Sequence, residues 1–484
     1  MLTKGMSHQL VGLERMAGCP MYYALACEQG TGKTWMLLAD AERQFKDELI
    51  DTVLVIAPKG VHSNWPRREI PKHLEVAYIA NWWVPEQTIK SKKVQALMLE
   101  RSDSLRIFAM NIDSLNTERG YSYAAKFLKA GRCMMIVDES TRIKSPSAGR
   151  SKKTVKLGTL ARSRRIASGT IMPNGPQDIF NQAKFLSPNL PLLGTSSFRA
   201  FVSEYTELLP ENSPLYKAIL EKTRGFERPQ ITAKDSKGRP KYKNLDKLAK
   251  LMSSWTYRVK KADCLDLPDK IYKIVGFDLP PAQRKTYDFM RDNLRIELEG
   301  NLHIFDKLVV KSKLRQAVSC FIMVDGEPTV LADKNPRMDL LKELIEDTDG
   351  KIIIWASFRA EIAAIADHLL RSNISFVQYH GGVNSKDREN AVDSFQEGEA
   401  RIFVGNPQAG GIGLTLTAAN TVIYYSNDYN LETRLQSEDR AHRIGTTKNV
   451  LYIDIVANDT IDEVVAAALQ SKADVQESVM ERLT

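Results

Sequence analysis

The sequence predicts an α/β protein of two lobes, each a parallel sheet flanked by helices. A chain of 484 residues is too long for one core, because single hydrophobic cores stop growing at about 250–300 residues. Short, continuous apolar runs alternate with helix-like segments, a pattern typical of buried parallel strands joined by crossover helices. These runs come in two series, which indicates two lobes rather than one.

Nine runs are predicted as strands, and each is bounded by loop residues or by a helix-like segment. The first series comprises residues 52–58, 106–110, 133–139 and 165–169, and the second comprises 351–357, 375–380, 402–405, 421–426 and 450–456.

Two regions without such runs are interpreted as helical insertions, one from each lobe. Residues 190–260 are polar, basic and helix-like, and residues 281–335 begin with a second helix-like stretch. The junction falls near residues 262–272, so we assign 1–265 to the first lobe and 266–484 to the second. A further helix is expected over about 460–484.

Composition excludes several classes of protein. With 43% hydrophobic and 26% charged residues, the chain is typical of soluble globular proteins. Its apolar runs are shorter than the roughly 18 residues of a membrane span, and the N-terminus has no apolar signal core. Five scattered cysteines without a CxxC pair argue against zinc sites and disulfides. We therefore expect a cytoplasmic protein of a prokaryotic or virus-infected cell with no membrane partner, and a nuclear location stays open.

The net charge of +9 permits a polyanionic partner such as nucleic acid. Lysine and arginine are dense in residues 153–165 and 233–250. A solubilising loop or helix face explains such segments equally well, so charge alone does not decide the partner.

The stretch CEQGTGKTW (residues 27–35) follows an apolar run and precedes a helix-like segment. This pattern predicts a phosphate-binding loop. Gly30, Thr31 and Gly32 form a tight turn whose backbone N–H groups face an anion. Lys33 is expected at the β- and γ-phosphates, and Thr34 at Mg²⁺. Cys27 stands where the strict motif has glycine.

An acidic pair ends the apolar run CMMIVDES. We expect Asp138 to hold Mg²⁺ and Glu139 to act as the general base on the attacking water. An apolar strand that ends in Asp-Glu, about 100 residues after Gly-Lys-Thr, favours nucleoside triphosphate hydrolysis, with ATP and Mg²⁺ as substrate and cofactor.

Taken with these motifs, the sequence resembles the Swi/Snf-type ATPases among the superfamily-two helicases. The resemblance covers nearly the whole chain and is carried by segments in the family's order: HQLVGLERM, VLVIAPKGVHSNWPRREI, DESTRIKSPSAGRSKK, RIASGTIMPNGPQDIF, LPDKIYKIVGFDLPPAQRKTYDFM, YHGGVNSKDRENAVDSF, AGGIGLTLTAANTVIYYSNDYN and QSEDRAHRIGTTKNVLYIDIVANDTIDEVV. It implies two RecA-like lobes with helical protrusions and a C-terminal brace helix, in a compact member without added modules.

The resemblance also implies roles for residues of both lobes. Gln9 is expected to read the adenine, and Gly413 to contact the nucleotide. In LQSEDRAHRIG (residues 435–445), Gln436 is expected to sense the nucleotide from the same helix as Arg440 and Arg443. These two are expected to act as arginine fingers, since planar guanidinium groups match the charge of a transferring phosphoryl group. The alternative for the two arginines is a salt-bridged helix surface, and His442 is expected to pack or to make a local hydrogen bond.

Several positions depart from the family's pattern: Ser140, Thr141, Ser168, Gly405, Asn406, Thr415 and Leu431. These differences leave the chemistry of ATP hydrolysis intact. They bear instead on how tightly DNA contact is coupled to hydrolysis.

Contacts to the DNA backbone are expected at loop ends and helix N-termini. The candidates are Lys59, Thr170, Asn174, Arg359 and the glycine loop that begins with Gly410 and Gly411. Such contacts carry no base code, so binding should be independent of sequence.

We therefore predict an ATP-dependent translocase on double-stranded DNA that remodels protein–DNA or branched DNA structures and acts as a monomer. Whether a protein partner targets it stays open. A strand-separating DNA or RNA helicase is the nearest alternative, with Trp82 and Trp83 as the aromatic pair that could form a wedge. A motor subunit of a larger DNA-processing complex is another, and a binding protein with an inactive ATPase fold is disfavoured by the intact motifs.

Overall fold

The chain forms two compact units in this computed structural model. Unit 1 comprises Met1–Leu265 and Lys472–Thr484, and unit 2 comprises Asp266–Ser471. The structure describes residues 1–86, 88–214, 216–217, 220, 230–235, 240–301, 304–332, 334–409 and 414–483.

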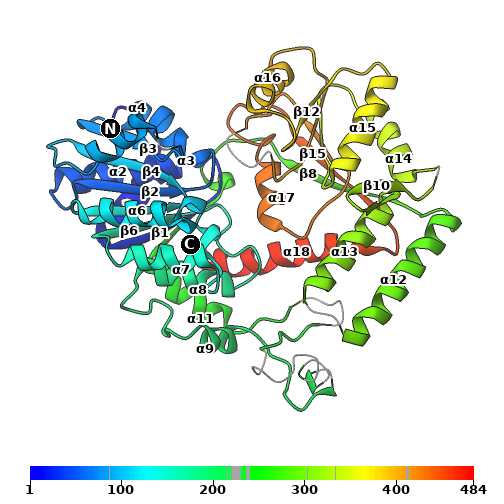
Figure 1. Cartoon of the computed structure of the whole chain (residues 1–484), viewed down its shortest axis with the longest axis horizontal. Helices are drawn as coiled ribbons and strands as arrows, with labels where there is room; N and C mark the ends of the chain where they lie inside the picture. The colour runs from blue at the N-terminus through cyan, green and yellow to red at the C-terminus, as the bar shows by residue number, and fades with distance from the viewer. Residues whose placement is uncertain are drawn as a thin grey trace. The chain divides into compact units, whose positions relative to one another are not determined.

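Unit 1 is built on a seven-stranded parallel sheet with the strand order β3-β4-β2-β5-β6-β1-β7 (Figure 1). The strands are β1 (Tyr22–Cys27), β2 (Thr52–Ala57), β3 (Tyr78–Trp82), β4 (Leu105–Asn111), β5 (Cys133–Asp138), β6 (Ser163–Ala167) and β7 (Thr256–Val259). Their carboxyl ends meet at one edge of the sheet, where loops from several strands can build a common site.

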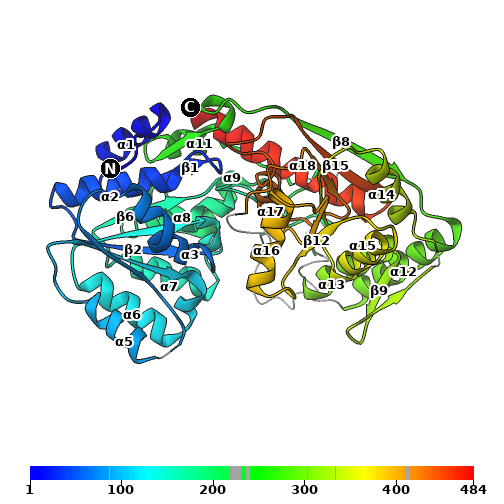
Figure 2. The same ribbon diagram turned by 90° about the horizontal axis from the view of Figure 1, so that it is seen from above.

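Helices cover both faces of this sheet, and Figure 2 shows α1 and α2 on one side with α6 and α7 on the other. The alternation of side chains along β2 explains this arrangement. Val53 and Val55 pack in the cluster that contains residues of α2, whereas Leu54 and Ile56 pack with residues of α6. The helices of unit 1 are α1 (Ser7–Gly18), α2 (Lys33–Lys46), α3 (Val61–Asn64), α4 (Ile70–His73), α5 (Ile89–Leu97), α6 (Glu118–Lys129), α7 (Gly149–Gly158), α8 (Gln177–Leu186), α9 (Phe198–Tyr205) and α11 (Leu245–Ser253).

Three strands of unit 1 lie outside the predicted series: β1, whose apolar run was noted only as preceding the glycine-rich loop, β3 and β7. β3 occupies an edge of the sheet and is half-buried along its length, so its mixed sequence YIANW gives no continuous apolar run. β7 lies at the end of the region expected to be helical and pairs with β1. Apart from β7, the described part of that region contains α9, α11 and isolated bridges such as Thr206 with Tyr242.

Unit 2 is built on a six-stranded parallel sheet with the order β12-β13-β11-β14-β15-β8. The strands are β8 (Lys270–Phe277), β11 (Ile352–Trp355), β12 (Phe376–Tyr379), β13 (Ile402–Gly405), β14 (Thr421–Tyr424) and β15 (Val450–Ala457). β8 was not predicted, because it is an edge strand with mostly exposed side chains. Two parallel sheets, each with its own cores, confirm the predicted α/β class with two lobes.

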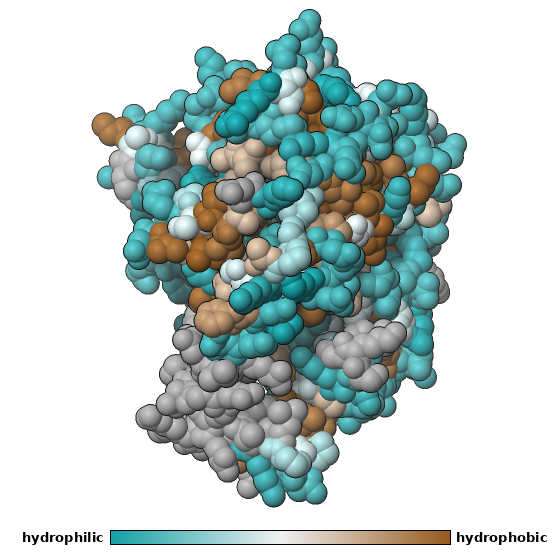
Figure 3. All heavy atoms as spheres, turned by 90° about the vertical axis from the view of Figure 1, so that its right-hand side faces the viewer, coloured by the Kyte–Doolittle hydropathy of each residue, from teal (hydrophilic) through white to brown (hydrophobic). Residues whose placement is uncertain are grey.

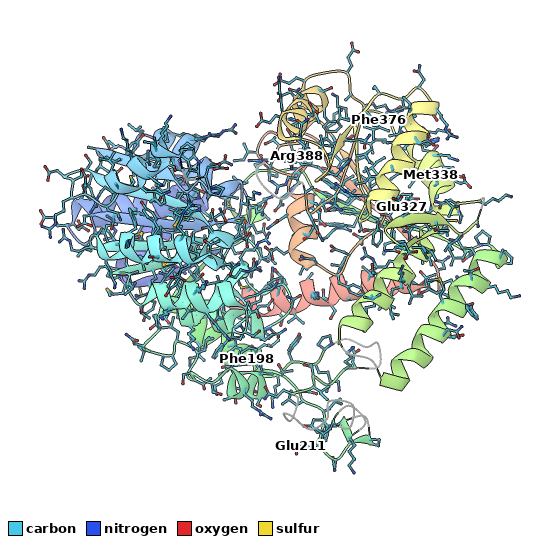
Figure 4. All side chains as sticks on the ribbon, in the orientation of Figure 1. Phe198, Glu211, Glu327, Met338, Phe376 and Arg388 are labelled. Atoms are coloured by element: carbon cyan, nitrogen blue, oxygen red, sulfur yellow. The ribbon has the colours of Figure 1, made fainter. Side chains whose placement is uncertain are left out.

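The helices of unit 2 lie on both faces of its sheet. Residues of α14 and α15 share one core cluster, and residues of α16 share another. Figure 4 shows Phe376 on β12 and Arg388 on α16, where the Arg388 guanidinium lies 5.7 Å from the centre of the Tyr379 ring. The described helices that begin in this unit are α12 (Pro281–Asn301), α13 (Ile304–Val318), α14 (Pro336–Glu346), α15 (Arg359–Arg371), α16 (Ser385–Gln396), α17 (Leu431–Glu438) and α18 (Ile461–Met480), of which α18 continues into unit 1 at Lys472.

The region 281–335 contains α12 and α13, followed by an antiparallel hairpin that was not predicted. The hairpin consists of β9 (Phe321–Val324) and β10 (Glu327–Val330). A two-residue turn, Asp325-Gly326, joins the strands, and both residues adopt positive φ angles of 49° and 90°. Asp-Gly is a favoured hairpin turn, so this signal was present in the sequence.

The face in Figure 3 is mainly hydrophilic, with separate hydrophobic patches among the charged side chains. Across the described residues, helices long and apolar enough to cross a bilayer are absent.

Candidate active site and nucleic-acid interface

The glycine-rich loop connects the end of β1 at Cys27 to the start of α2 at Lys33. Gly30 and Gly32 have φ angles of 86° and 83°, which lie in the left-handed region that glycine adopts without strain. A side chain at Gly32 would also collide with the amide of Gln9. The two glycines therefore meet a backbone requirement, as expected for a loop that wraps an anion.

The ammonium of Lys33 lies at the base of this loop. Its Nζ donates hydrogen bonds to the carbonyl oxygens of Cys27 at 2.9 Å and Glu28 at 3.1 Å. Thr31 is buried, and its hydroxyl donates to the same Glu28 carbonyl at 2.8 Å. The side chains of Lys33 and Thr31 thus hold the loop in shape, and the ammonium of Lys33 places a positive charge inside it.

Gln9 of α1 reaches the same loop. Its Nε2 donates to the Thr31 carbonyl at 3.2 Å, while its Oε1 accepts from the Met6 amide at 2.9 Å. His8 Nε2 lies 2.8 Å from that Thr31 carbonyl, a neighbour that sequence reasoning missed. The helix is therefore bonded to the glycine-rich loop through two adjacent side chains.

Asp138 ends β5, two strands from β1 in the sheet. Its Oδ2 accepts from Trp65 Nε1 at 3.1 Å, and its Oδ1 accepts from the Glu139 amide at 3.0 Å. Burial raises the pKa of Asp138, while the Trp65 hydrogen bond and the positive charge of Lys33 act in the opposite direction. Trp65 was not predicted as a site residue, although it lies inside the quoted segment VLVIAPKGVHSNWPRREI.

Glu139 lies between the glycine-rich loop and the loop that follows β6. Its carboxylate accepts from Gln29 Nε2 at 3.4 Å and from Ser168 Oγ at 3.4 Å. Close packing at Gly169 supports this arrangement, since a Cβ there would lie 3.3 Å from the Gln29 amide nitrogen. Glu139 itself has a φ of 51°, a strained value for a residue with a side chain.

The residues at this edge suit a magnesium ion held together with a nucleotide. Groups of three or more His, Cys, Asp or Glu side chains able to hold a metal are absent from the residues that the structure describes. Mg²⁺ commonly takes one or two protein ligands and completes its shell with phosphates and water. Asp138, whose burial disfavours an uncompensated negative charge, fits that requirement together with Thr34, which lies in the first turn of α2.

Arg440 and Arg443 were expected on the same helix as Gln436, but the structure places them outside it. α17 ends at Glu438, so both arginines lie in the turns that follow it. Arg443 Nη1 donates to the Leu414 carbonyl at 3.3 Å and to Thr415 Oγ1 at 3.0 Å, and Arg440 Nη1 lies 3.5 Å from the same carbonyl. The two guanidinium groups therefore converge through the bent backbone rather than through helical spacing.

A buried ionic network holds α17. Arg434 bonds Glu438 at 2.8 Å and Asp454 at 2.5 Å, and its guanidinium lies 3.6 Å from the centre of the Tyr424 ring. Glu438 also accepts from the hydroxyl of Tyr272 at 2.7 Å. Burial works to raise the pKa of Glu438, but the cations Lys270 and Arg434 and the hydrogen bonds lower it below its usual value. This network fixes the end of the helix from which the arginine segment departs.

Gln436 and His442 have partners within the protein. Gln436 Nε2 donates to Glu432 Oε1 at 3.4 Å. His442 is buried, and its Nε2 lies 2.7 Å from the carbonyl of Pro268, which is distant in sequence.

The candidate DNA contacts fall into three groups. Lys59 and Arg359 are exposed, at the end of β2 and at the start of α15 respectively. Thr170 is buried, and the Asn174 side chain is bonded to Asp178 and to Lys472. Gly410, Gly411 and the nucleotide candidate Gly413 lie outside the described residues.

Part of the basic segment 153–165 is structural. Arg165 is buried and pairs with the buried Asp40 at 2.9 Å. Arg164 donates from Nε to the Leu186 carbonyl at 2.6 Å. In the second basic segment, Lys247 pairs with Glu204 at 2.8 Å. The count of cations in these segments therefore overstates the charge available to a polyanion.

Trp82 and Trp83 are both covered by arginines. The Arg67 guanidinium lies 4.7 Å from the Trp82 ring centre, and that of Arg119 lies 4.4 Å from the Trp83 ring centre. Trp83 is also buried in the core beside Tyr123. The pair therefore packs as an anchor in this structure.

Two parallel-sheet lobes define the class of protein, one with a glycine-rich loop beside an acidic pair and one with convergent arginines. Such a protein is a nucleoside triphosphatase of the helicase type. Comparison with known families agrees. Residues 8–320 match the SNF2-related domain, and residues 336–445 match the helicase conserved C-terminal domain.

Similar proteins span most of this chain. The DNA annealing helicase and endonuclease ZRANB3 of Mus musculus is 27% identical over 94% of this chain and 39% of its own length. The chromodomain-helicase-DNA-binding protein 1-like of Danio rerio is 24% identical over 97% and 42%, and the SWI/SNF chromatin-remodeling complex subunit snf22 of Schizosaccharomyces pombe is 25% identical over 98% and 28%. Among solved structures, the Sulfolobus solfataricus SWI2/SNF2 ATPase core in complex with dsDNA has a TM-score of 0.40 at 22% identity, covering 99% of this chain and 97% of that chain.

The chain belongs to the SNF2-related family, which confirms the Swi/Snf-type resemblance. It spans about two-fifths or less of the length of the three relatives described above.

Proposed function

We propose that this protein is an ATP-dependent translocase on double-stranded DNA, which hydrolyses ATP and moves along the DNA backbone to remodel protein–DNA or branched DNA structures. The main support is the position of Glu139. Its carboxylate bonds both Gln29 of the glycine-rich loop and Ser168, and the Ser168 hydroxyl in turn accepts from the Thr170 amide at 3.2 Å. The candidate base is thus bonded to the loop that carries two candidate DNA contacts.

Each side chain has a role in this proposal. Lys33 binds the β- and γ-phosphates, and Glu139 accepts a proton from the attacking water. Arg440 and Arg443 stabilise the negative charge that spreads over the γ-phosphoryl oxygens, and Gln436 senses the nucleotide. Thr34 and Asp138 hold Mg²⁺, which neutralises charge on the phosphates when it is bound.

DNA is the proposed partner for two reasons. The names of relatives include a DNA annealing helicase and a subunit of a chromatin-remodeling complex. In addition, Lys59 and Arg359 are exposed cations at the ends of secondary-structure elements, where proteins commonly contact phosphates. Such contacts favour binding that is independent of base sequence.

Strand separation is the second candidate, and the structure gives it less support. A wedge needs aromatic side chains that are free to stack on a base pair, but Trp83 is buried and Trp82 lies beneath Arg67. A role as the motor of a larger complex is compatible with the same active site, since one relative is named as a subunit of a complex.

The test is ATP hydrolysis measured without nucleic acid and with single-stranded DNA, duplex DNA or duplex RNA at matched low salt. We expect duplex DNA to stimulate turnover most, because backbone contacts in two lobes should follow the duplex. Equal or greater stimulation by single strands or RNA would contradict the proposal and favour strand separation. Displacement of a third strand from a DNA triplex then tests movement separately from hydrolysis.

A further inference from the structure

The C-terminal turns of α18 contact two segments that flank the glycine-rich loop of unit 1. Lys472 Nζ donates to Asn174 Oδ1 at 3.1 Å, in the loop that follows β6. Glu477, about one and a half helical turns further on, accepts from Arg258 Nη2 at 2.5 Å and pairs with Lys260. Both cations lie at the end of β7.

The first contact closes a set of bonds around Asn174. The Asn174 backbone amide and Nδ2 donate to Asp178 Oδ2 at 2.8 Å and 3.1 Å, and its carbonyl accepts from Tyr242 Oη at 3.0 Å. The next residue, Gly175, has a φ of 123°, and a side chain there would collide with the Tyr242 hydroxyl. Lys472 is the partner of Asn174 that comes from the C-terminal segment of unit 1. The helix therefore holds the loop that also carries Ser168, a partner of Glu139.

The second contact is connected to the glycine-rich loop by backbone bonds. Arg258 lies opposite Ala26 in the pairing of β7 with β1. The amide of Glu28 donates to the Val259 carbonyl at 2.9 Å, and the amide of Lys261 donates to Glu28 Oε2 at 2.9 Å. The Glu28 carbonyl in turn accepts from Lys33. Glu477 is therefore connected to Lys33, the lysine expected to bind phosphate, through hydrogen bonds at Arg258, Val259 and Glu28.

The end of the helix is packed firmly enough to act as a support. Val479 and Met480 are buried in the same core cluster as Trp255 and Leu248. Arg482, just beyond the helix, pairs with Asp246 of α11. Loss of a large buried apolar side chain destabilises a core, so the segment is part of the fold of unit 1.

We propose that the C-terminal end of α18 is a positioning element of the ATPase site, in which Lys472 sets the loop 168–175 and Glu477 sets the end of β7 against the glycine-rich loop. This inference rests on the proposed function. Because α18 begins at Ile461, within unit 2, one continuous helix carries residues of both units. Changes in the contacts of Lys472 and Glu477 with the rest of unit 1 should therefore alter the rate of ATP hydrolysis without any change in the catalytic side chains.

The test uses Lys472→Met and Glu477→Gln, with Lys472→Arg as the conservative variant. Lys250→Met on α11 and Glu463→Gln on α18 are the controls, since both residues are exposed. Hydrogen exchange over residues 168–178 and 27–35 reports the positions of the two loops. Steady-state ATPase reports function. We expect Lys472→Met to raise exchange over 168–178 by about tenfold, as for the loss of one charge-assisted hydrogen bond, to lower kcat by a similar factor and to leave the KM for ATP unchanged.

Lys472→Arg should retain most of the wild-type exchange and kcat, and the controls should match the wild type. Unchanged exchange over 168–178 in Lys472→Met would overturn the positioning role, and so would raised exchange with normal kcat. A uniform rise in exchange across unit 1 would also overturn it, because that result indicates general destabilisation. If the wild type hydrolyses no ATP, the proposed function fails, whereas the exchange data still decide whether the helix holds the loop.

Discussion

Lys33 and Arg443, which we propose as phosphate-binding residues, are held in place by different kinds of hydrogen bond. Lys33 donates to two loop carbonyls, so its charge is held inside the glycine-rich loop before any ligand arrives. Arg443 donates to the Leu414 carbonyl and the Thr415 hydroxyl, which leaves it bonded to neutral acceptors that an anion can replace. Both arrangements keep a cation in place without neutralising it.

Two substitutions separate the roles of these residues. Lys33→Ala should abolish ATP turnover and weaken ATP binding, because the phosphates lose their point charge. Arg443→Ala should bind ATP normally while hydrolysis falls by about 10³-fold or more, as in other systems that lose an arginine finger. Single-turnover hydrolysis and binding of a fluorescent ATP analogue measure the two effects. Normal hydrolysis by Arg443→Ala would show that the finger assignment is wrong.

At the scale of elements, buried ion pairs hold α17 in place. Arg434, Glu438 and Asp454 form a network in which Glu438 is buried and also bonds Lys270 and Tyr272. Removing one partner from a buried ion pair commonly destabilises a protein by about 3–5 kcal/mol. The segment that bears both arginines begins directly after this helix.

The lowered pKa of Glu438 makes this contribution dependent on pH. A carboxylate with a lowered pKa in the folded protein stabilises it above the pKa of the unfolded chain, about 4.3 for glutamate, and that stabilisation is lost as pH falls towards the folded pKa. We therefore expect Glu438→Gln to lower the melting temperature at pH 7 and the gap from wild type to narrow below about pH 5. Thermal melts from pH 7 to pH 4 provide the measurement, with exposed Glu389→Gln as the control. A gap that is constant with pH would contradict this account.

Strands with a continuous apolar run were predicted from the sequence. Strands that are recognisable only by their pairing with a neighbouring strand were not. The run CMMIVD gives β5 because every residue in it but the last is buried. In contrast, β3 and β8 are edge strands with exposed or half-buried side chains, and their pairing is visible only in the sheet. The end of α17 at Glu438 was missed because the following residues keep a helix-like composition.

The same distinction applies to the candidate site. Motifs marked Lys33, Asp138 and Glu139, and the structure places Asp138 close enough to Lys33 for the lysine's charge to act on its pKa. Gln29 and Trp65 lie inside quoted segments but were given no role there, and Lys472 lies outside every quoted segment. Their proposed roles come from contacts with residues distant in sequence. Their proposed roles could be found only from the folded chain.

At the scale of the whole molecule, the formal charge of +9 is a poor guide to the surface that meets DNA. Arg106, Arg165 and Arg337 are among the largest fully buried side chains, and Lys46, Lys247 and Lys342 have acidic partners. Exposed cations at element ends, such as Lys59 and Arg359, are therefore the sites at which counterion release should be sought.

Salt dependence tests this distinction. The logarithm of the DNA-binding constant should fall linearly with the logarithm of salt concentration, with a slope of about −0.9 for each phosphate contacted on duplex DNA. We expect Lys59→Gln and Arg359→Gln each to reduce the slope by about one, uniformly across DNA sequences. Fluorescence anisotropy over a salt series gives the slopes, and Lys342→Gln, which removes an exposed partner of Asp339, is the control. A slope unchanged in both test variants would remove these residues from the interface.

The left-handed backbone at Glu139 has a consequence beyond the chemistry. A non-glycine residue held in such a conformation costs about 1–3 kcal/mol, so we expect Glu139→Gly to relieve backbone strain while it removes the carboxylate that we propose as the general base. On this assignment, stability and turnover make opposite demands on residue 139.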